Sequence, residues 1–470
     1  MPAAPGGETM AKAQQPLRRG RLFSSDYCFL FKEGLEETSS VFSSIGKGYS
    51  SECSARKSPK SFRLSGDFLL FNRAETIFSV RHCLCLLLRP FSVHCGVQCR
   101  LLMKPLKIGI TGVRGIVGET FTPEVAVGFA QAFATYLDGG RILICRDTRP
   151  SGPMVRSAVV AGLLAAGCEV IDLGICPTPS LQLAVTWLKA YGGIAVTAGH
   201  NPSPWNALKF VRGDGLYLNP QQAEELLDIF HQGEFAKARW DNIQPAIQYR
   251  DPIEHHLESL TRVFDVETIK RRRLKVAVDC CNGACSLLLP RWLAELGCEV
   301  LAINDDPQGV FPHRPEPTPA TMAQLSALVK ASHADIGFAH DADGERLGIV
   351  TELGEPLSEE STLALAARIR LEQSPGAIVT NVSTTSAIEQ IAARYGGRVV
   401  RTQVGQAYIS EAMLEHQAIL GGEGSGGVTV PEVHLTHDSA AAVGLILEGL
   451  ARFGGTLSEI VPSLFGSAGL

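Results

Sequence analysis

The chain has 470 residues, of which 45% are hydrophobic and 19% charged, and it contains 47 Gly and 26 Pro. This composition excludes collagen-like and wholly disordered proteins, and the length allows about two to four domains. The formal net charge of −5 hides two unlike parts: residues 1–102 carry 14 Lys and Arg against 8 Asp and Glu, whereas residues 103–470 carry 29 against 40. The charge by itself argues neither for nor against a nucleic-acid partner.

Residues 1–102 form a segment unlike the rest of the chain. They hold 6 of the 13 Cys and 9 of the 20 Phe, without the apolar periods of helices or strands. The apolar run Cys83–Leu88 is far too short to cross a bilayer. Three origins remain open: translated DNA before a true start at Met103, a transit or regulatory extension, and a folded cap. We expect a non-family extension that is disordered or mis-started.

The seven cysteines after Met103 lie mostly in apolar, strand-like runs and contain no C-x-x-C pair. A zinc site is therefore not indicated. Cys281 and Cys285 have a spacing that a redox pair can use, although one loop beside a strand is the commoner explanation. Buried, reduced cysteines predict a cytoplasmic protein.

Past Met103, a strand, a polar loop, a helix and a Gly-led second strand recur three times. The copies span residues 141–170, 274–300 and 377–399, and the first two share Gly-Cys-Glu-Val. Each apolar run is nearly continuous in Val, Ile and Leu, as in parallel strands buried on both faces. The repeats predict three α/β domains in series, with expected bounds of 103–250, 251–356 and 357–470.

The first repeated helix shows the expected apolar face, because Val155, Val159 and Leu163 recur at helical spacing. Ser151 and Pro153 are typical of a helix start, the serine as cap and the proline in the first turn. The expected helices are Pro153–Ala166, Ser286–Leu296 and Thr385–Tyr395, and the expected seams between domains are Trp240–Asp251 and Gly354–Ser358.

The first of four polar loops, Thr111–Gly115, follows an expected strand at Lys107–Ile110. Its two glycines let the backbone turn sharply and present amides and Arg114 to an anion. A simple hairpin turn explains the same pattern.

The second loop, Thr197–Pro202, holds His200 and Asn201 between Gly199 and a proline, which limits the backbone. Lys209 follows in an amphipathic strand pattern. Its ammonium can transfer protons if burial or nearby cations lower its pKa. A solvated strand residue is the plainer interpretation.

The third loop follows an apolar strand and places three carboxylates at alternate positions, Asp341, Asp343 and Glu345. Such carboxylates repel one another, and together they can bind one hard cation. The remaining ligands of a calcium hand are missing, so Mg²⁺ with waters or a phosphate oxygen fits better. A solvated acidic turn is the alternative.

The fourth loop, Gly421–Gly427, places Glu423 and Ser425 at alternate positions among five glycines. A carboxylate and a hydroxyl facing one ligand suit sugar hydroxyl groups, and a flexible glycine turn is the alternative. Ligands of open parallel sheets bind at the carboxyl ends of strands, where all four loops are expected.

The four motifs, in the order Thr-Gly-x-Arg-Gly, x-x-His-Asn-Pro, Asp-x-Asp-Gly-x-Arg and Gly-Glu-x-Ser-Gly, resemble those of the alpha-D-phosphohexomutases. That family includes phosphoglucomutase, phosphomannomutase and phosphoglucosamine mutase, and Trp205–Phe210 is similar to the last two. The resemblance covers about residues 105–462. It implies tandem, related α/β/α domains with mixed, mainly parallel sheets around a cleft.

The resemblance also implies an activity. In the family, a phosphoserine and a hexose 1,6-bisphosphate exchange a phosphoryl group between the 1- and 6-positions of a hexose phosphate, with Mg²⁺ balancing charge. By the same resemblance, Asp341, Asp343 and Glu345 match the metal ligands. Arg346, Arg114, His200 and Lys209 match catalytic residues, with Lys209 as general acid or base, and Glu423 and Ser425 match the sugar-hydroxyl loop.

Three departures from the family pattern matter. Gly199 stands at the phosphoserine position and has no oxygen to phosphorylate. Glu345 stands where the family has Asp. No Arg-x-Ser-Gly-Thr-Glu segment occurs in the 470 residues, so a fourth domain that grips the distal phosphate is expected to be absent.

Three hypotheses follow. The chain is a phosphohexomutase acting on glucosamine or mannose phosphates, with Thr197, Ser203 or added bisphosphate replacing the missing serine. Alternatively, it is a degenerate sugar-phosphate-binding paralogue or fragment without turnover. A phosphatase that uses a metal-bound water is the third. We expect a small hexose phosphate as partner and neither nucleic acid nor membrane. The sequence leaves the oligomeric state open.

Overall fold

The computed structural model describes residues 106–464, so the predictions for residues 1–102 lie outside the described residues. The first domain is built on a seven-stranded sheet in the order β1-β2-β6-β5-β3-β4-β7. Strands β3, β4, β5 and β7 pair in parallel, while β6 runs antiparallel to β2 and β5. The strands are β1 Lys107–Gly109, β2 Gly112–Ile116, β3 Arg141–Arg146, β4 Glu169–Ile175, β5 Gly192–Val196, β6 Trp205–Arg212 and β7 Ile247–Gln248.

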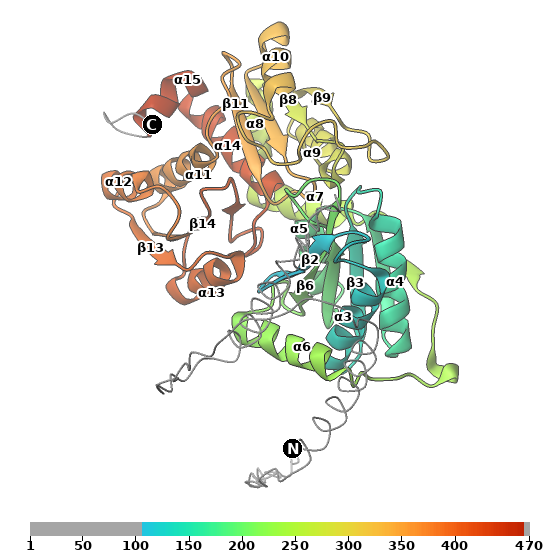
Figure 1. Cartoon of the computed structure of the whole chain (residues 1–470). Coiled ribbons are helices and arrows are strands. Elements are labelled where there is room, and N and C mark those ends of the chain that lie inside the picture. The colour runs from blue at the N-terminus through green and yellow to red at the C-terminus, as the bar shows by residue number, and fades with distance from the viewer. Residues whose placement is uncertain (1–105, 465–470) are drawn as a thin grey trace, which may run out of the picture. The chain divides into compact units, whose positions relative to one another are not determined.

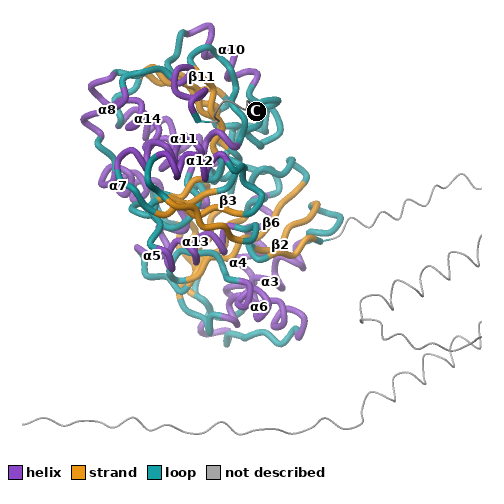
Figure 2. The backbone as a smooth tube through the Cα atoms, turned by 90° about the vertical axis from the view of Figure 1, so that its left-hand side faces the viewer, coloured by secondary structure: helices purple, strands orange, loops and turns teal. Residues whose placement is uncertain are grey.

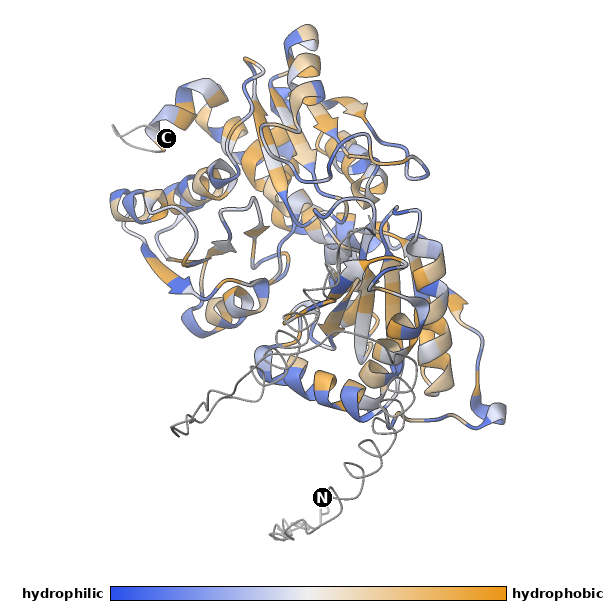
Figure 3. Cartoon of the chain, viewed as in Figure 1, coloured by the Kyte–Doolittle hydropathy of each residue, from blue (hydrophilic) through white to orange (hydrophobic). Residues whose placement is uncertain are grey.

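Helices cover both faces of this sheet, because alternate strand residues are buried on opposite sides. Ile142 and Ile144 of β3 pack with α3, α4 and α6, whereas Leu143 and Cys145 pack with α5. Helices α3 and α6 run beside each other in both views (Figure 1, Figure 2). Figure 3 shows apolar strands and a more hydrophilic α6, of which only Leu226 is buried. The helices are α3 Pro123–Tyr136, α4 Gly152–Ala165, α5 Thr178–Trp187 and α6 Pro220–Gln232, with a 3₁₀ turn η3 Trp240–Asn242.

The second domain has a four-stranded sheet in the order β11-β10-β8-β9, in which only β11 is antiparallel to its neighbour. Its strands are β8 Lys275–Asp279, β9 Glu299–Ile303, β10 Ile336–His340 and β11 Leu347–Thr351. Its helical segments are α7 Ile253–Val263, α8 Val266–Arg272, η4 Ala284–Leu287, α9 Leu289–Glu295 and α10 Ala323–Ser332.

The third domain repeats this plan with the order β13-β12-β14-β15, in which β15 is the antiparallel strand. Its strands are β12 Ala377–Asn381, β13 Arg398–Thr402, β14 Leu420–Gly422 and β15 Val428–Thr429. Its helices are α11 Glu360–Gln373, α12 Ala387–Arg394, α13 Gln406–His416, α14 Ser439–Phe453 and α15 Leu457–Ile460, followed by η5 Val461–Ser463. The predicted fold of tandem α/β/α domains with mixed sheets is confirmed.

Three local expectations need correction. The helix predicted over Ser286–Leu296 is broken: η4 ends at Leu287 and α9 begins at Leu289, with Pro290, which lacks an N–H, in its first turn. Ser151 does not cap α4; its hydroxyl instead accepts from Asn206 Nδ2 at 2.9 Å. Part of the expected seam Trp240–Asp251 forms β7, an edge strand beside β4.

One hydrophobic core runs through all three domains and encloses a buried polar chain at His256 of α7. The Ser180 hydroxyl of α5 lies 2.8 Å from Nδ1 of His256, and Nε2 lies 2.8 Å from Oδ2 of Asp438, the residue before α14. No single helix in residues 106–464 is long and apolar enough to cross a membrane; α14 with the bent segment after it passes by length and composition only.

Candidate active site

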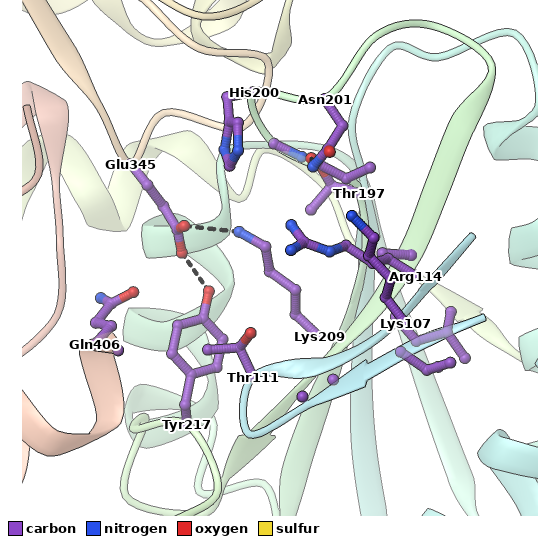
Figure 4. A pocket seen from close by; sticks show the side chains of 18 of the residues that line it. Lys107, Thr111, Arg114, Thr197, His200, Asn201, Lys209, Tyr217, Glu345 and Gln406 are labelled. Carbon is purple, nitrogen blue, oxygen red and sulfur yellow. Dashed lines mark hydrogen bonds and ion pairs between the residues drawn. The ribbon is translucent and has the colours of Figure 1, made fainter. Parts of the chain in front are cut away.

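A cavity of about 420 Å³ is lined by loops from the three domains (Figure 4). Seven of the residues singled out from the sequence line it: Arg114, Gly199, His200, Lys209, Glu345, Arg346 and Glu423. Asp341, Asp343 and Ser425 do not line it directly. The cavity therefore brings cationic side chains of the first two domains and the Glu423 loop of the third domain to one space.

The first loop is a hairpin, and it also serves the cavity. Strands β1 and β2 pair antiparallel, with Gly109 opposite Gly112. Gly112 has φ of 141°, and a Cβ there would lie 1.9 Å from the carbonyl oxygen of Leu208. Only glycine therefore allows β2 to lie against β6, which brings Arg114 to the cavity wall.

The loop Thr197–Pro202 is fixed by Arg149, a residue that sequence reasoning missed. Its guanidinium is fully buried and pairs with Asp147 at 2.9 Å. The other donors bind the carbonyl oxygens of Gly199, Asn201, Pro202 and Trp205 at 2.6, 2.7, 2.8 and 3.1 Å. One planar guanidinium thus fixes the backbone of this loop through its carbonyl oxygens.

Gly199 faces the acidic loop with no side chain. Its φ of 52° lies in the left-handed region, and a Cβ built there would be 3.2 Å from Oδ1 of Asp343 and 3.6 Å from Oδ2 of Asp341. Neither substitute carrier is placed to act: the buried Thr197 hydroxyl donates to Asp147 at 2.6 Å, and Ser203 is exposed and does not line the cavity.

The three carboxylates of the third loop do not face one point. Asp343 Oδ2 accepts from Lys209 at 2.6 Å, whereas its buried Oδ1 has no hydrogen-bond partner among the described residues. Glu345 turns away, accepting from Lys209 at 2.7 Å and from the Tyr217 hydroxyl (Figure 4). Within residues 106–464 no three His, Cys, Asp or Glu side chains converge as a metal-binding group.

Two features of the acidic loop nevertheless suit a cation beside Asp341 and Asp343. Burial, and then the charges of Asp343 and Glu345, hold the pKa of Asp341 well above its usual range. A cation beside these carboxylates would relieve that repulsion and satisfy the orphaned Oδ1 of Asp343. The two aspartates fit a hard cation, and Glu345 fits it only after leaving Lys209 and Tyr217.

The condition for proton transfer by Lys209 is not met in this arrangement. Burial lowers the pKa of its ammonium, but Asp343 and Glu345 outweigh that and raise the pKa above its ordinary value. His200 shows the opposite effect: burial, with the charges of Arg346 and Lys209, lowers its pKa to about 3. Lys209 is therefore a fixed cation and His200 a neutral ring at physiological pH.

Glu423 of the fourth loop is held by donors from outside its motif. Oε1 accepts from Asn381 Nδ2 at 3.0 Å and from the Gly405 amide at 3.3 Å, and Oε2 accepts from the Ser425 hydroxyl at 3.4 Å. Asn381 stands at the end of β12, a strand-end position that could have drawn attention in the sequence. His437, which also lines the cavity, has no such signal.

Family models for phosphoglucomutase/phosphomannomutase α/β/α domains I, II and III match residues 105–237, 254–354 and 358–467. A phosphoglucomutase/phosphomannomutase of Thermococcus kodakarensis is 39% identical over 363 residues, which are 76% of this chain and 79% of the relative. A protein of Methanopyrus kandleri named a probable phosphoglucosamine mutase is 36% identical, covering 76% and 78%.

The solved structures agree with the sequence relatives. The crystal structure of a phosphoglucomutase/phosphomannomutase family protein from Burkholderia thailandensis superposes with a TM-score of 0.68 at 29% identity, covering 76% of this chain and 79% of that one. The predicted family is thereby confirmed. The chain belongs to the phosphoglucomutase/phosphomannomutase family, whose members are phosphohexomutase-type isomerases.

Proposed function

We propose that the chain interconverts the 1- and 6-phosphates of a hexose, of the glucosamine or mannose type, with Mg²⁺. The observation that carries this proposal is one cavity whose lining includes three cations, Arg114, Lys209 and Arg346, together with the neutral His200 and the carboxylate of Glu423. Fixed cations bind and orient a phosphoryl group, and a buried carboxylate accepts from sugar hydroxyls. The names of the relatives support this substrate class.

Asp341 and Asp343 would hold Mg²⁺, with Glu345 joining once it leaves Lys209. The metal would supply charge neutralisation for the transferring group. Arg346 and Lys209 bind phosphate oxygens, and the buried Arg149 keeps the loop beside them rigid. A metal-free form is therefore expected to keep weak phosphate binding through these cations.

Because Gly199 offers no oxygen, the phosphoryl carrier has to come from outside the chain. A hexose 1,6-bisphosphate can serve as donor: it passes its 1-phosphoryl group to O6 of a hexose 1-phosphate, which releases hexose 6-phosphate and regenerates a bisphosphate. Gly199 also favours a second candidate function, hexose-phosphate binding without turnover. We further propose a cytoplasmic location and no nucleic-acid or membrane partner.

The experiment follows ³¹P NMR spectra of glucosamine 1-phosphate and mannose 1-phosphate with Mg²⁺, with and without glucose 1,6-bisphosphate. We expect 6-phosphate only when the bisphosphate is present, and no covalent phosphoryl group in the intact mass of the protein. The variant Gly199→Ser should gain the mass of one phosphoryl group, whereas Ser203→Ala, the exposed serine of the same loop, should behave as the parent. Binding by calorimetry without turnover selects the second candidate, and no binding rejects both.

A further inference from the structure

A histidine outside every sequence motif faces the carboxylate of Glu423 in the cavity. Nε2 of His437 lies 3.8 Å from Oε2 of Glu423, and the two side chains are 5% and 16% exposed. This Nε2 is buried and has no hydrogen-bond partner among residues 106–464. A buried nitrogen without a partner beside a carboxylate requires an explanation.

The surroundings of His437 favour a proton on the nitrogen that faces Glu423. An ionised carboxylate only accepts hydrogen bonds, so the nitrogen that faces Glu423 has to be a donor. Nδ1 lies 3.0 Å from the Thr429 hydroxyl, which can donate to it and so leave the proton on Nε2. Gly427 makes room for the ring, because a Cβ there would lie 2.5 Å from Cδ2 of His437.

The contacts of Glu423 are divided unequally between its two oxygens. Oε1 is already held by Asn381 and by the Gly405 amide, whereas among residues 106–464 Oε2 meets only the Ser425 hydroxyl at 3.4 Å and His437. Burial raises the pKa of Glu423, but the neighbouring His437, followed by Asn381, outweighs it and lowers the pKa to about 2. The carboxylate therefore stays ionised, and its Oε2 can still accept a hydrogen bond from a ligand.

We propose that His437 is a positioning residue whose Nε2–H faces Glu423 and aims its Oε2 at the hydroxyl groups of a bound hexose. This inference rests on the proposed function and deepens it, because it assigns recognition of the neutral, hydroxyl-bearing ring to one pair in the third domain. The phosphoryl group is bound separately, by the cations of the first and second domains.

The binding test uses calorimetry on the full chain with Mg²⁺ and two probes, glucosamine 6-phosphate and inorganic phosphate. His437→Ala should weaken hexose-phosphate binding about tenfold and leave phosphate binding unchanged, since only the sugar contact is lost. His437→Gln, which keeps an N–H donor, should restore most of the affinity. His416→Ala, a histidine of the same domain outside the cavity, is the matched control.

Equal weakening of both probes by His437→Ala, or no weakening of either, would overturn the proposal. Should that variant fail to fold, Thr429→Val removes the hydroxyl behind the ring and should cause the same selective loss, at about threefold.

A second measurement needs no ligand. In ¹⁵N-histidine NMR spectra of the free protein, His437 should carry its proton on Nε2, and Glu423→Gln should shift that resonance. A proton on Nδ1 alone refutes the pair even if sugar phosphates bind. A failure of hexose-phosphate binding with the Nε2 proton in place refutes the proposed function and leaves the His437–Glu423 pair standing.

Discussion

Replacing the buried Arg149 by Met tests what holds the loop at Gly199. Met keeps an apolar stem of similar length but removes a guanidinium that is fully buried against Asp147. Burial already raises the pKa of Asp147 despite the charge of Arg149, so the lone carboxylate would be costly. Breaking a buried pair by removing one partner typically costs about 3–5 kcal/mol, and we expect about 4 kcal/mol here.

The assay is urea unfolding at neutral pH, with amide exchange of residues 197–205 as a local measure. The double variant Asp147→Asn with Arg149→Met should recover about 2 kcal/mol, because a neutral amide leaves no buried charge. Arg262→Met is the control, since Arg262 and its partner Glu258 are 75% and 47% exposed and the loss of that pair should cost less than about 1 kcal/mol. A loss below about 1 kcal/mol for Arg149→Met, or no recovery in the double variant, refutes the reasoning.

Three further outcomes are expected. Glu423 has a pKa of about 2 in the folded state against an ordinary 4.5, so its stabilisation is complete above pH 4.5 and is lost as the pH falls toward 2. In Glu423→Gln, the urea midpoint should depend less on pH between 4.5 and 2 than it does in the parent protein. The same pH dependence in both proteins would contradict this. The ring of His200 should stay neutral to about pH 3, with NMR resonances that do not move between pH 7 and 4.5; a titration near pH 6 would show that burial and Arg346 do not govern it. Gly112→Ala should cost about 3 kcal/mol, measured by urea unfolding, because its Cβ would collide with the Leu208 carbonyl; an unchanged midpoint would refute the collision.

Local sequence patterns were enough to predict many of the strands and helices. The continuous apolar run at Ala377–Asn381 is strand β12 residue for residue, and the helical face of Val155, Val159 and Leu163 is buried as predicted. Such features depend on neighbours within one turn or one strand. Pro290 was also readable locally, since a residue without an N–H fits the first turn of a helix.

Contacts between distant segments could not be predicted in the same way. Arg149 donates four hydrogen bonds to carbonyl groups some fifty residues later in the chain, and only the folded structure shows that these groups meet. Glu345 was grouped with two aspartates by spacing, but in the structure it accepts from Lys209 and Tyr217 of another domain. The acidic motif is thus local, whereas the partner of each carboxylate is a property of the tertiary structure.

The buried chain from Ser180 through His256 to Asp438 has a consequence for how this protein can be divided. The three residues of that chain lie on α5, on α7 and immediately before α14, and one hydrophobic core joins the same elements. Excising any one domain would expose apolar surface and leave a buried imidazole or carboxylate without its hydrogen-bond partner. We therefore expect that the three domains do not fold independently of one another. A chimaera between relatives would have to exchange α5, α7 and α14 together.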